Sequence, residues 1–216
     1  MRAKATVISD IGFVGIIPVI RTDKPEQIIP LCEAVVAGGI TILELTMTIP
    51  NPVETLKKVV AHFGQKALIG MGSLLNGAMA RAAADAGAEF LVTPITKLEV
   101  VAVGRTANRP VMLGAYTPTE AALAMEAGAD FIKIFPADNL GPNYLKALRA
   151  PMPQLKLVPT GGVTLENAAD FLKAGAAALG IGGSLVTSQI LKESNWAELT
   201  RLSSAYVRVV QEARKK

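Results

Sequence analysis

The sequence has 216 residues, half of them hydrophobic, and its formal net charge at pH 7 is +4. This length supplies enough apolar surface for one sizeable core, and the longest apolar runs fall well short of the roughly 18 residues that a membrane-spanning helix requires. The basic residues are not interleaved with aromatic residues, as they are in many nucleic-acid-binding surfaces. We therefore expect neither a membrane nor a nucleic acid as partner. A single cysteine and the lack of an export pattern predict a cytoplasmic protein.

In chain order, residues 1–12 are expected to form an N-terminal extension or a short helix, and residues 195–216 the last helix. Between them, short apolar runs alternate with segments of helical periodicity, which is the pattern of repeated βα units. The predicted strands are residues 15–20, 42–47, 67–72, 90–94, 110–115, 131–136, 156–161 and 178–183.

Eight strands that alternate with helices predict a (β/α)8 TIM barrel, formed by a single domain over residues 1–216. An open, doubly wound sheet is the alternative, but no dinucleotide-binding fingerprint follows the first strand. In a barrel the chemistry takes place at the carboxyl ends of the strands, so the residues that end each strand are the candidates for a functional site.

Glycine pairs follow the seventh and eighth predicted strands. They lie in two segments, Thr160, Gly161 and Gly162 in the first and Gly182, Gly183 and Ser184 in the second. Glycine lets the backbone come close to an anion, and barrels often bind phosphate with the loops at these two strands. The pairs therefore predict a phosphate site with hydroxyl donors beside it, although glycines that only make tight turns would give the same pattern.

Lys133 lies in the middle of the sixth predicted strand, where side chains alternate between the barrel interior and the surrounding helices. Phe131, Lys133 and Phe135 share the inward face, and Ile132 and Ile134 point outward. Burial disfavours the charged form of an amine, and a neutral amine is a nucleophile that attacks carbonyl groups. Lys133 is therefore a candidate for Schiff-base chemistry.

Glu44 is the acidic residue found within the eight predicted strands, and it takes an inward position in the second. A carboxyl group near Lys133 would move the protons that Schiff-base chemistry requires. The alternative is a buried ion pair between Glu44 and Lys133 that fixes the barrel register. The combination of a lysine, a carboxylate and a phosphate site at one end of a barrel favours a Schiff-base lyase.

Five segments together resemble the KDPG/KHG aldolase family, the class I aldolases that act on 2-keto-3-deoxy-6-phosphogluconate and 4-hydroxy-2-oxoglutarate. The segments are "LIGMGSLL", "GAYTPTEA", "FIKIFPADNLGPNYLKAL", "LVPTGGV" and "GIGGSLV", and the resemblance extends from about residue 14 to residue 187. It implies a (β/α)8 barrel, usually a homotrimer, that cleaves a keto acid to pyruvate and an aldehyde with no metal and no cofactor.

By the same resemblance, Lys133 matches the Schiff-base lysine and Glu44 the acid/base glutamate. Ser73, Pro94 and Phe135 match positions of the pyruvate pocket, and the glycine pairs with Ser184 match the phosphate site.

The sequence departs from the family pattern at the end of the second predicted strand. Relatives have Glu-x-Thr-x-Arg there, with the arginine on the substrate carboxylate, whereas this chain ends the pattern with Thr48. Arg21, at the end of the first strand, is the candidate to replace that guanidinium, since arginine binds carboxylates through two parallel hydrogen bonds. A solvated arginine that leads into a helix is the alternative for Arg21.

The leading hypothesis is an aldolase that cleaves a 2-keto-3-deoxy-6-phospho sugar acid to pyruvate and glyceraldehyde 3-phosphate. Cleavage of 4-hydroxy-2-oxoglutarate to pyruvate and glyoxylate is a further activity that the resemblance implies. The alternatives are an aldolase for the galactonate-derived phosphate, a non-aldolase enzyme with a phosphate-binding barrel, and an oligomeric scaffold that retains an ancestral pocket.

Overall fold

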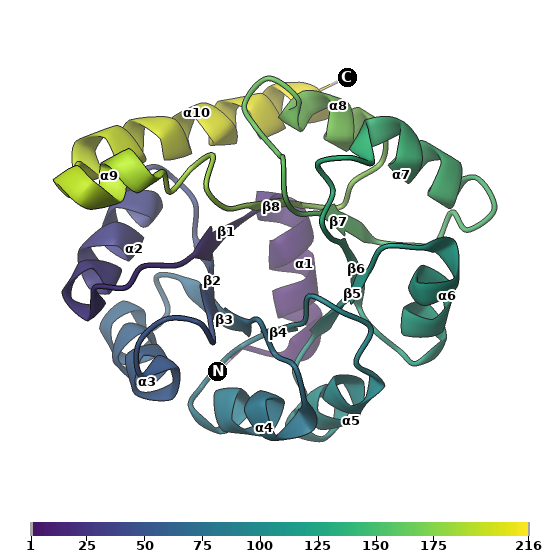
Figure 1. Ribbon diagram of the computed structural model, residues 1–216, viewed down its shortest axis with the longest axis horizontal. Coiled ribbons are helices and arrows are strands. Elements are labelled where there is room, and N and C mark those ends of the chain that lie inside the picture. The colour runs from purple at the N-terminus through teal and green to yellow at the C-terminus, as the bar shows by residue number, and fades with distance from the viewer. Residues whose placement is uncertain (1, 216) are drawn as a thin grey trace.

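The computed structural model describes residues 2–215, which form a ring of eight parallel strands around a filled interior (Figure 1). Each strand pairs with its neighbours in the order β8-β1-β2-β3-β4-β5-β6-β7, and bridges at Leu157–Ala176 and Thr160–Gly180 join β7 to β8. The strands are β1 (Ile16–Ile20), β2 (Ile42–Thr46), β3 (Leu68–Gly72), β4 (Leu91–Val92), β5 (Val111–Ala115), β6 (Phe131–Ile134), β7 (Leu157–Pro159) and β8 (Leu179–Ile181). The fold is the (β/α)8 barrel that the sequence predicts.

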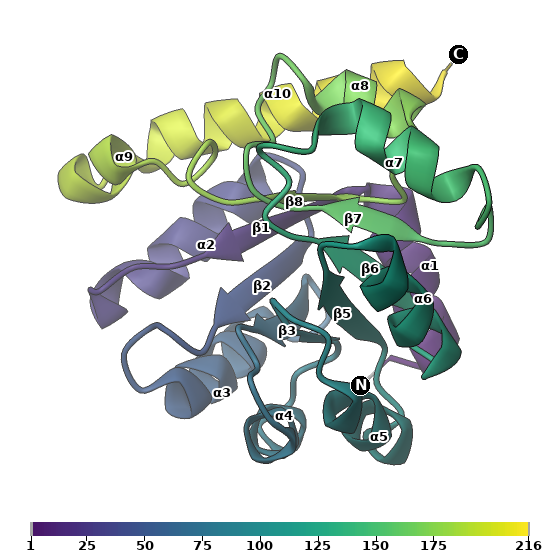
Figure 2. The ribbon, with the colours of Figure 1, turned by 45° about the vertical axis from the view of Figure 1, so that its right-hand side comes forward.

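Apart from α1 (Lys4–Val14), the helices surround the strands on the outside (Figure 2). They are the short η1 (Pro25–Gln27), α2 (Ile28–Ala37), α3 (Pro52–Phe63), α4 (Gly77–Asp85), α5 (Leu98–Ala107), α6 (Pro118–Glu126), α7 (Gly141–Arg149), α8 (Ala168–Lys173), α9 (Ser188–Glu193) and α10 (Trp196–Arg214). Several end in repeated Ala-Gly segments, where Gly87 and Gly128 have φ of 100° and 95°. Such backbone angles favour glycine and turn the chain back towards the next strand.

Helix α1 crosses the amino-terminal end of the barrel (Figure 1). Val7 and Ile11, both fully buried, pack with interior side chains such as Ile17 and Phe90. The segment for which the sequence allows an extension or a short helix is therefore a helix that fills the base of the barrel.

Two separate apolar clusters confirm the predicted alternation of the strand residues. Phe131 and Val158 belong to the interior cluster, whereas Ile132, Ile134 and Leu43 pack outward against the helices. Both faces of each strand are thus buried, which explains the rich content of branched apolar residues in the strands. Lys133 and Glu44 occupy the interior positions between these outward residues.

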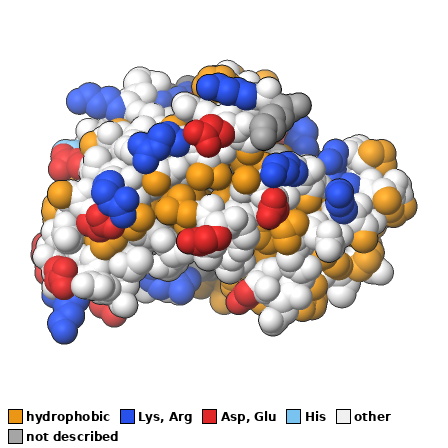
Figure 3. All heavy atoms as spheres, turned by 90° about the horizontal axis from the view of Figure 1, so that it is seen from above, with side chains coloured by type: hydrophobic (Ala, Val, Ile, Leu, Met, Phe, Trp, Pro, Cys, Tyr) orange, Lys and Arg blue, Asp and Glu red, His pale blue; other side chains and the backbone are white. Residues whose placement is uncertain are grey.

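The outer face that carries α10 is polar and of mixed charge. Figure 3 shows lysine and arginine side chains interspersed with acidic ones over this face, with apolar atoms between them. Within α10, Arg201 Nη2 lies 2.6 Å from Glu198 Oε1. Across residues 2–215, no helix combines the length and apolar character that crossing a membrane demands.

Candidate active site

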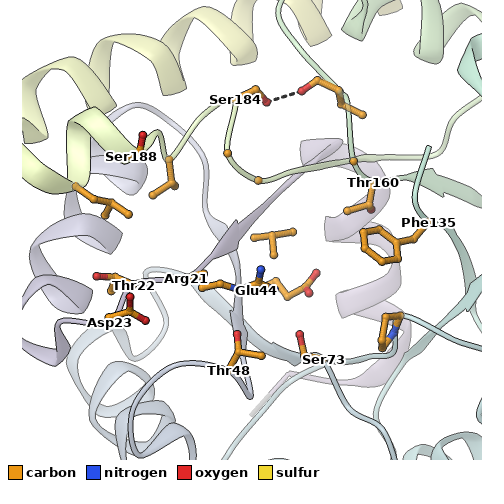
Figure 4. Close-up of a pocket in the computed structure, with 18 of the residues that line it drawn as sticks. Arg21, Thr22, Asp23, Glu44, Thr48, Ser73, Phe135, Thr160, Ser184 and Ser188 are labelled. Atoms are coloured by element: carbon orange, nitrogen blue, oxygen red, sulfur yellow. Dashed lines mark hydrogen bonds between the residues drawn. The ribbon is translucent and has the colours of Figure 1, made fainter. Parts of the chain in front are cut away.

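A cavity of about 1120 Å³ opens at the carboxyl ends of the strands. It brings together all thirteen residues that the sequence predicts for the site, and ten of its lining residues are labelled in Figure 4. The predicted residues that line it are Arg21, Glu44, Thr48, Ser73, Pro94, Lys133, Phe135, Thr160, Gly161, Gly162, Gly182, Gly183 and Ser184. They come from seven different strands, and the closure of the barrel brings these strand ends to one place.

Lys133 lies at the base of the cavity, and only 5% of its surface is exposed. Its position is fixed by the parallel ladders of β6, in which Lys133 is opposite Gly114 on one side and Val158 on the other. The Nζ atom lies 5.3 Å from the centre of the Phe135 ring and 3.6 Å from Glu44 Oε1. A primary amine is thus held in an apolar setting with a carboxyl group beside it.

Glu44 is 2% exposed and faces Lys133 from strand β2. Its Oε1 atom has no hydrogen-bond partner among residues 2–215. Burial raises the pKa of the Glu44 carboxyl above its ordinary value, and Lys133 and Arg21 offset only part of that rise. A raised pKa lets a carboxyl group hold a proton at higher pH than an ordinary carboxyl does, which suits a group that both takes up and returns protons.

Hydroxyl and ring groups lie around this pair of residues. In Figure 4 Glu44 lies near the centre of the residues drawn, with Thr48 and Ser73 below it and Phe135 and Thr160 to the right and above. Thr48 Oγ1 is 2.8 Å from Thr46 Oγ1. Ser73 has a φ of 59°, a left-handed backbone angle that is uncommon for serine and frequent at functional sites.

Pro94 follows strand β4, and the backbone there is held by the buried side chain of Thr93. The Thr93 hydroxyl accepts the Gly114 N–H at 3.0 Å and donates to the Ile95 carbonyl oxygen at 2.5 Å. A side chain at Gly114 would overlap the Pro94 backbone. Strands β4 and β5 therefore place the Pro94 ring at the cavity wall by close backbone contact.

Arg21 directly follows strand β1 and has an exposed side chain at the cavity wall. Its charge lowers the pKa of the Glu44 carboxyl, an effect that requires the guanidinium to lie near that end of the cavity. Thr48, where the family pattern has arginine, lines the same cavity. The two positions thus share one end of the site.

The two glycine pairs form the far end of the cavity. Gly161 and Gly162 both have left-handed backbone angles, with φ of 91° and 68°. A Cβ atom at Gly182 or Gly183 would meet no atom of the described residues within 4 Å, because both glycines face open space. The backbone hydrogen bonds of residues 2–215 leave the N–H groups of Gly162, Gly183 and Ser184 without acceptors. An anion can reach these donors.

The side chains beside the glycine pairs already have partners. The Ser184 hydroxyl donates to the Val163 carbonyl oxygen at 2.5 Å, a contact drawn in Figure 4. It therefore links the loop after β8 to the loop after β7. Thr160 is 6% exposed, and its hydroxyl lies 3.5 Å from the Val158 carbonyl oxygen. What these loops offer a ligand is chiefly backbone N–H groups.

Three charged residues that the sequence analysis did not single out also line the cavity: Asp23, Lys24 and Lys192. Asp23 and Lys24 follow Arg21 in the chain, so a wider search of the strand ends finds them. Lys192 belongs to α9 and has no local signal, since the helix reaches the cavity through tertiary contacts. One such contact joins Gln27 Nε2 to the Leu191 carbonyl oxygen at 2.8 Å. Residues 2–215 contain no cluster of three or more His, Cys, Asp or Glu side chains placed to hold a metal ion.

Comparison with known proteins identifies the family of this chain. The family model described as KDPG and KHG aldolase matches residues 7–202. This chain belongs to the KDPG and KHG aldolase family. Members of the family are carbon–carbon lyases, and the chain is therefore an enzyme of that class.

Two curated aldolases illustrate the range within the family. The 2-dehydro-3-deoxy-6-phosphogalactonate aldolase of Escherichia coli is 34% identical over 91% of this chain and 96% of its own length. The 2-dehydro-3-deoxy-phosphogluconate aldolase of Pseudomonas aeruginosa is also 34% identical, over 87% of this chain and 86% of its own. Aldolases named for either sugar acid are thus equally similar to this chain.

A solved aldolase structure has the same barrel. The KDPG aldolase of Legionella pneumophila superposes with a TM-score of 0.85 at 30% identity, over 92% of this chain and 97% of that one. That structure is described as holding pyruvate captured as a covalent carbinolamine intermediate. A carbinolamine is the covalent adduct that precedes a Schiff base on the reaction path.

Proposed function

We propose that this chain cleaves 2-keto-3-deoxy-6-phosphogluconate reversibly to pyruvate and glyceraldehyde 3-phosphate through a Schiff base on Lys133. The observation that carries the proposal is the buried Lys133 amine, 3.6 Å from the Glu44 carboxyl at the base of the cavity. The glycine pairs at the far end of the same cavity are suited to the phosphate. Cleavage of 4-hydroxy-2-oxoglutarate requires only the base of the cavity and is a second expected activity.

The reaction begins when Lys133 Nζ attacks the C2 carbonyl of the substrate and water leaves the carbinolamine to give an iminium. The Glu44 carboxylate takes the proton from the C4 hydroxyl as the C3–C4 bond breaks. The electron pair of that bond moves into the iminium, giving an enamine, and the aldehyde leaves. Glu44 then returns the proton to C3, and water hydrolyses the new iminium to release pyruvate and restore the amine.

The remaining residues of the site bind the two ends of the substrate. Arg21 binds the carboxylate of the pyruvyl end, with Thr48 and Ser73 as hydroxyl partners nearby. Pro94 and Phe135 exclude water from the iminium. The phosphate is bound by the N–H groups of the loops after β7 and β8, where the positive end of the peptide dipoles favours an anion.

Borohydride reduction in the presence of pyruvate tests this chemistry. We expect the protein mass to rise by one reduced pyruvyl group, on the peptide that contains Lys133, and Lys133→Met to abolish both the adduct and the cleavage. A Lys133→Met protein that cleaves substrate at the wild-type rate would refute the proposal. Lys156→Met is the matched control, because Lys156 lies outside the cavity and near the opposite end of the barrel.

The galactonate-derived phosphate is the second candidate substrate, favoured by the similarity to the E. coli phosphogalactonate aldolase. The two sugar acids differ at one stereocentre and share the pyruvyl and phosphate ends. Pyruvate release from the gluconate-derived, galactonate-derived and hydroxyoxoglutarate substrates, measured side by side, decides between them. A specificity constant higher for the galactonate-derived phosphate would replace the proposed substrate with it.

We also propose that the enzyme is a homotrimer. Three large apolar side chains near the mouth of the barrel support an interface, since Leu75, Ile95 and Leu98 are each exposed by 46–48%. Light scattering coupled to size-exclusion chromatography measures the assembly, and the mass of one chain is 22.6 kDa. A monomer at working concentrations would contradict this proposal and leave the chemistry of the site intact.

A further inference from the structure

Gly72, the last residue of strand β3, provides the space that the Glu44 carboxyl occupies. A Cβ atom at Gly72 would lie 2.7 Å from Glu44 Cδ and 3.0 Å from Cγ, and it would overlap Oε1. Separations this short are not compatible with the packed side chain. The carboxyl group therefore lies flat on the backbone of β3, in a place that any side chain at Gly72 would fill.

The backbone around Gly72 has no freedom to move away from Glu44. Gly72 is opposite Thr46 in the β2–β3 ladder, and its carbonyl oxygen accepts the Met47 N–H at 2.9 Å. Residues Leu68 to Gly72 are all buried. A side chain added at Gly72 would thus displace the Glu44 carboxyl and leave the strands in place.

The carboxyl group also has no room to move down into the barrel. Glu44 is opposite Gly70 in the ladder, and the space over Gly70 is filled by the Phe90 ring, which a Cβ atom there would overlap. The two glycines of β3 thus have separate uses, since Gly70 makes room for the core and Gly72 for the carboxyl group. Lys133 lies beside the carboxyl group, with its Nζ 3.6 Å from Oε1, and the cavity opens above the pair.

We propose that Gly72 is a positioning residue. Because it has no side chain, the Glu44 carboxyl can lie close to Lys133, where it can exchange protons with a substrate bound to that lysine. The proposal rests on the proposed function of Lys133 and Glu44. It predicts that Gly72 matters for the proton-transfer steps and not for the attack of Lys133 on the keto group. A misplacement of about 1 Å in a reacting group costs roughly 10²-fold in rate.

Gly72→Ala separates these steps. Adduct formation is measured by borohydride trapping with pyruvate, and proton transfer by the exchange of deuterium from solvent into the pyruvate methyl group, followed by proton NMR. We expect the variant to form the adduct, and its deuterium exchange and kcat to fall by roughly 10²-fold. Gly12→Ala is the control, because a Cβ atom at Gly12 in α1 would meet no described atom within 4 Å.

A double-variant cycle distinguishes positioning from loss of packing. The clash of an added Cβ is most severe with Oε1 and Cδ of Glu44, and Glu44→Asp removes the atom that carries the carboxyl out to this point. In the Glu44→Asp background, Gly72→Ala should therefore change the exchange rate by less than about threefold. If the two substitutions acted independently, Gly72→Ala would have its full effect of roughly 10²-fold there too. Gly72→Ala should lower the melting temperature, and Glu44→Asp should restore it in the double variant. If Gly72→Ala alone does not fold, a folded double variant still shows that the clash is with Glu44.

Three results would overturn the inference, and the third is distinguishable because it also overturns the proposed function. A wild-type protein that forms the adduct, beside a Gly72→Ala variant that exchanges deuterium at the wild-type rate, refutes the role of Gly72 alone. Equal effects of Gly72→Ala in both backgrounds also refute it, because they place the damage in the strand. A wild-type protein that forms no adduct overturns the proposed function, and the inference with it.

Discussion

Replacement of Arg21 by alanine tests how this chain binds a carboxylate without the arginine of the family pattern on strand β2. Hydrogen bonds to charged groups contribute about 1.5–3 kcal/mol when well shielded from water. Arg21 is exposed, so screening reduces its contribution to about 1–2 kcal/mol. At 1.4 kcal/mol for each factor of ten, kcat/KM should fall roughly 5- to 30-fold.

The assay is pyruvate release from the cleaved substrate at concentrations below KM, so that the rate reports kcat/KM directly. Arg21→Lys is the matched control, because it retains the charge but loses the paired N–H donors. Its kcat/KM should lie between those of wild type and Arg21→Ala. Thr48→Arg in the Arg21→Ala background places a guanidinium at the position of the family pattern. Because both positions line the same end of the cavity, we expect this second change to restore part of the lost kcat/KM.

The pH profile gives an independent measure of the same residue. The Arg21 guanidinium lowers the pKa of the Glu44 carboxyl, so its removal raises that pKa further above the ordinary value. The base form of Glu44 is then reached only at higher pH, and the acidic limb of the kcat profile should move to higher pH. An Arg21→Ala protein with unchanged kcat/KM and an unchanged acidic limb would refute the reasoning on both counts.

Three further predictions follow from the cavity and the core. Burial raises the pKa of Glu44, so the folded state favours the protonated carboxyl and loses stability as the pH rises. The melting temperature of Glu44→Gln minus that of wild type should therefore increase from pH 5 to pH 8. Gly183→Val fills the anion site, so KM for the phosphorylated substrate should rise roughly tenfold while deuterium exchange into pyruvate is retained. Ile11→Ala removes a fully buried side chain from the base of the barrel and should cost about 2–4 kcal/mol in denaturant unfolding, with adduct formation intact. A loss below about 0.5 kcal/mol would show that α1 does not fill the base as described.

The sequence predicts the strands and the inward side chains well, because successive side chains of a strand point to opposite faces. One polar residue in an apolar strand is then enough to show which residues face inward. Lys133 is polar between Ile132 and Ile134, and this contrast alone orients the strand. Strand ends are less well predicted, as in β4, where the expected residues 90–94 reduce to Leu91–Val92. There the Thr93 side chain takes up hydrogen bonds that the ladder would otherwise continue.

Features that depend on contacts between distant segments have no signal in a single sequence. In the sequence Gly72 does not differ from any other strand glycine, and only the position of Glu44 on the neighbouring strand β2 shows what its missing side chain allows. The partner of the Ser184 hydroxyl is 21 residues away in the chain, so its link to Val163 depends on the folded loops. The packing of α1 into the barrel likewise depends on contacts of Val7 and Ile11 with side chains from distant strands, such as Phe90.

Because α1 fills the base of the barrel, substrate and products share the opening at the carboxyl ends of the strands. In the proposed reaction the pyruvyl fragment stays bonded to Lys133 at the base of the cavity, and the phosphorylated aldehyde lies between it and the mouth. The aldehyde must therefore depart before pyruvate, and in the condensing direction pyruvate must arrive before the aldehyde. Because α1 closes the opposite end, both fragments have only this opening, and the bond to Lys133 gives their order of release in the proposed reaction.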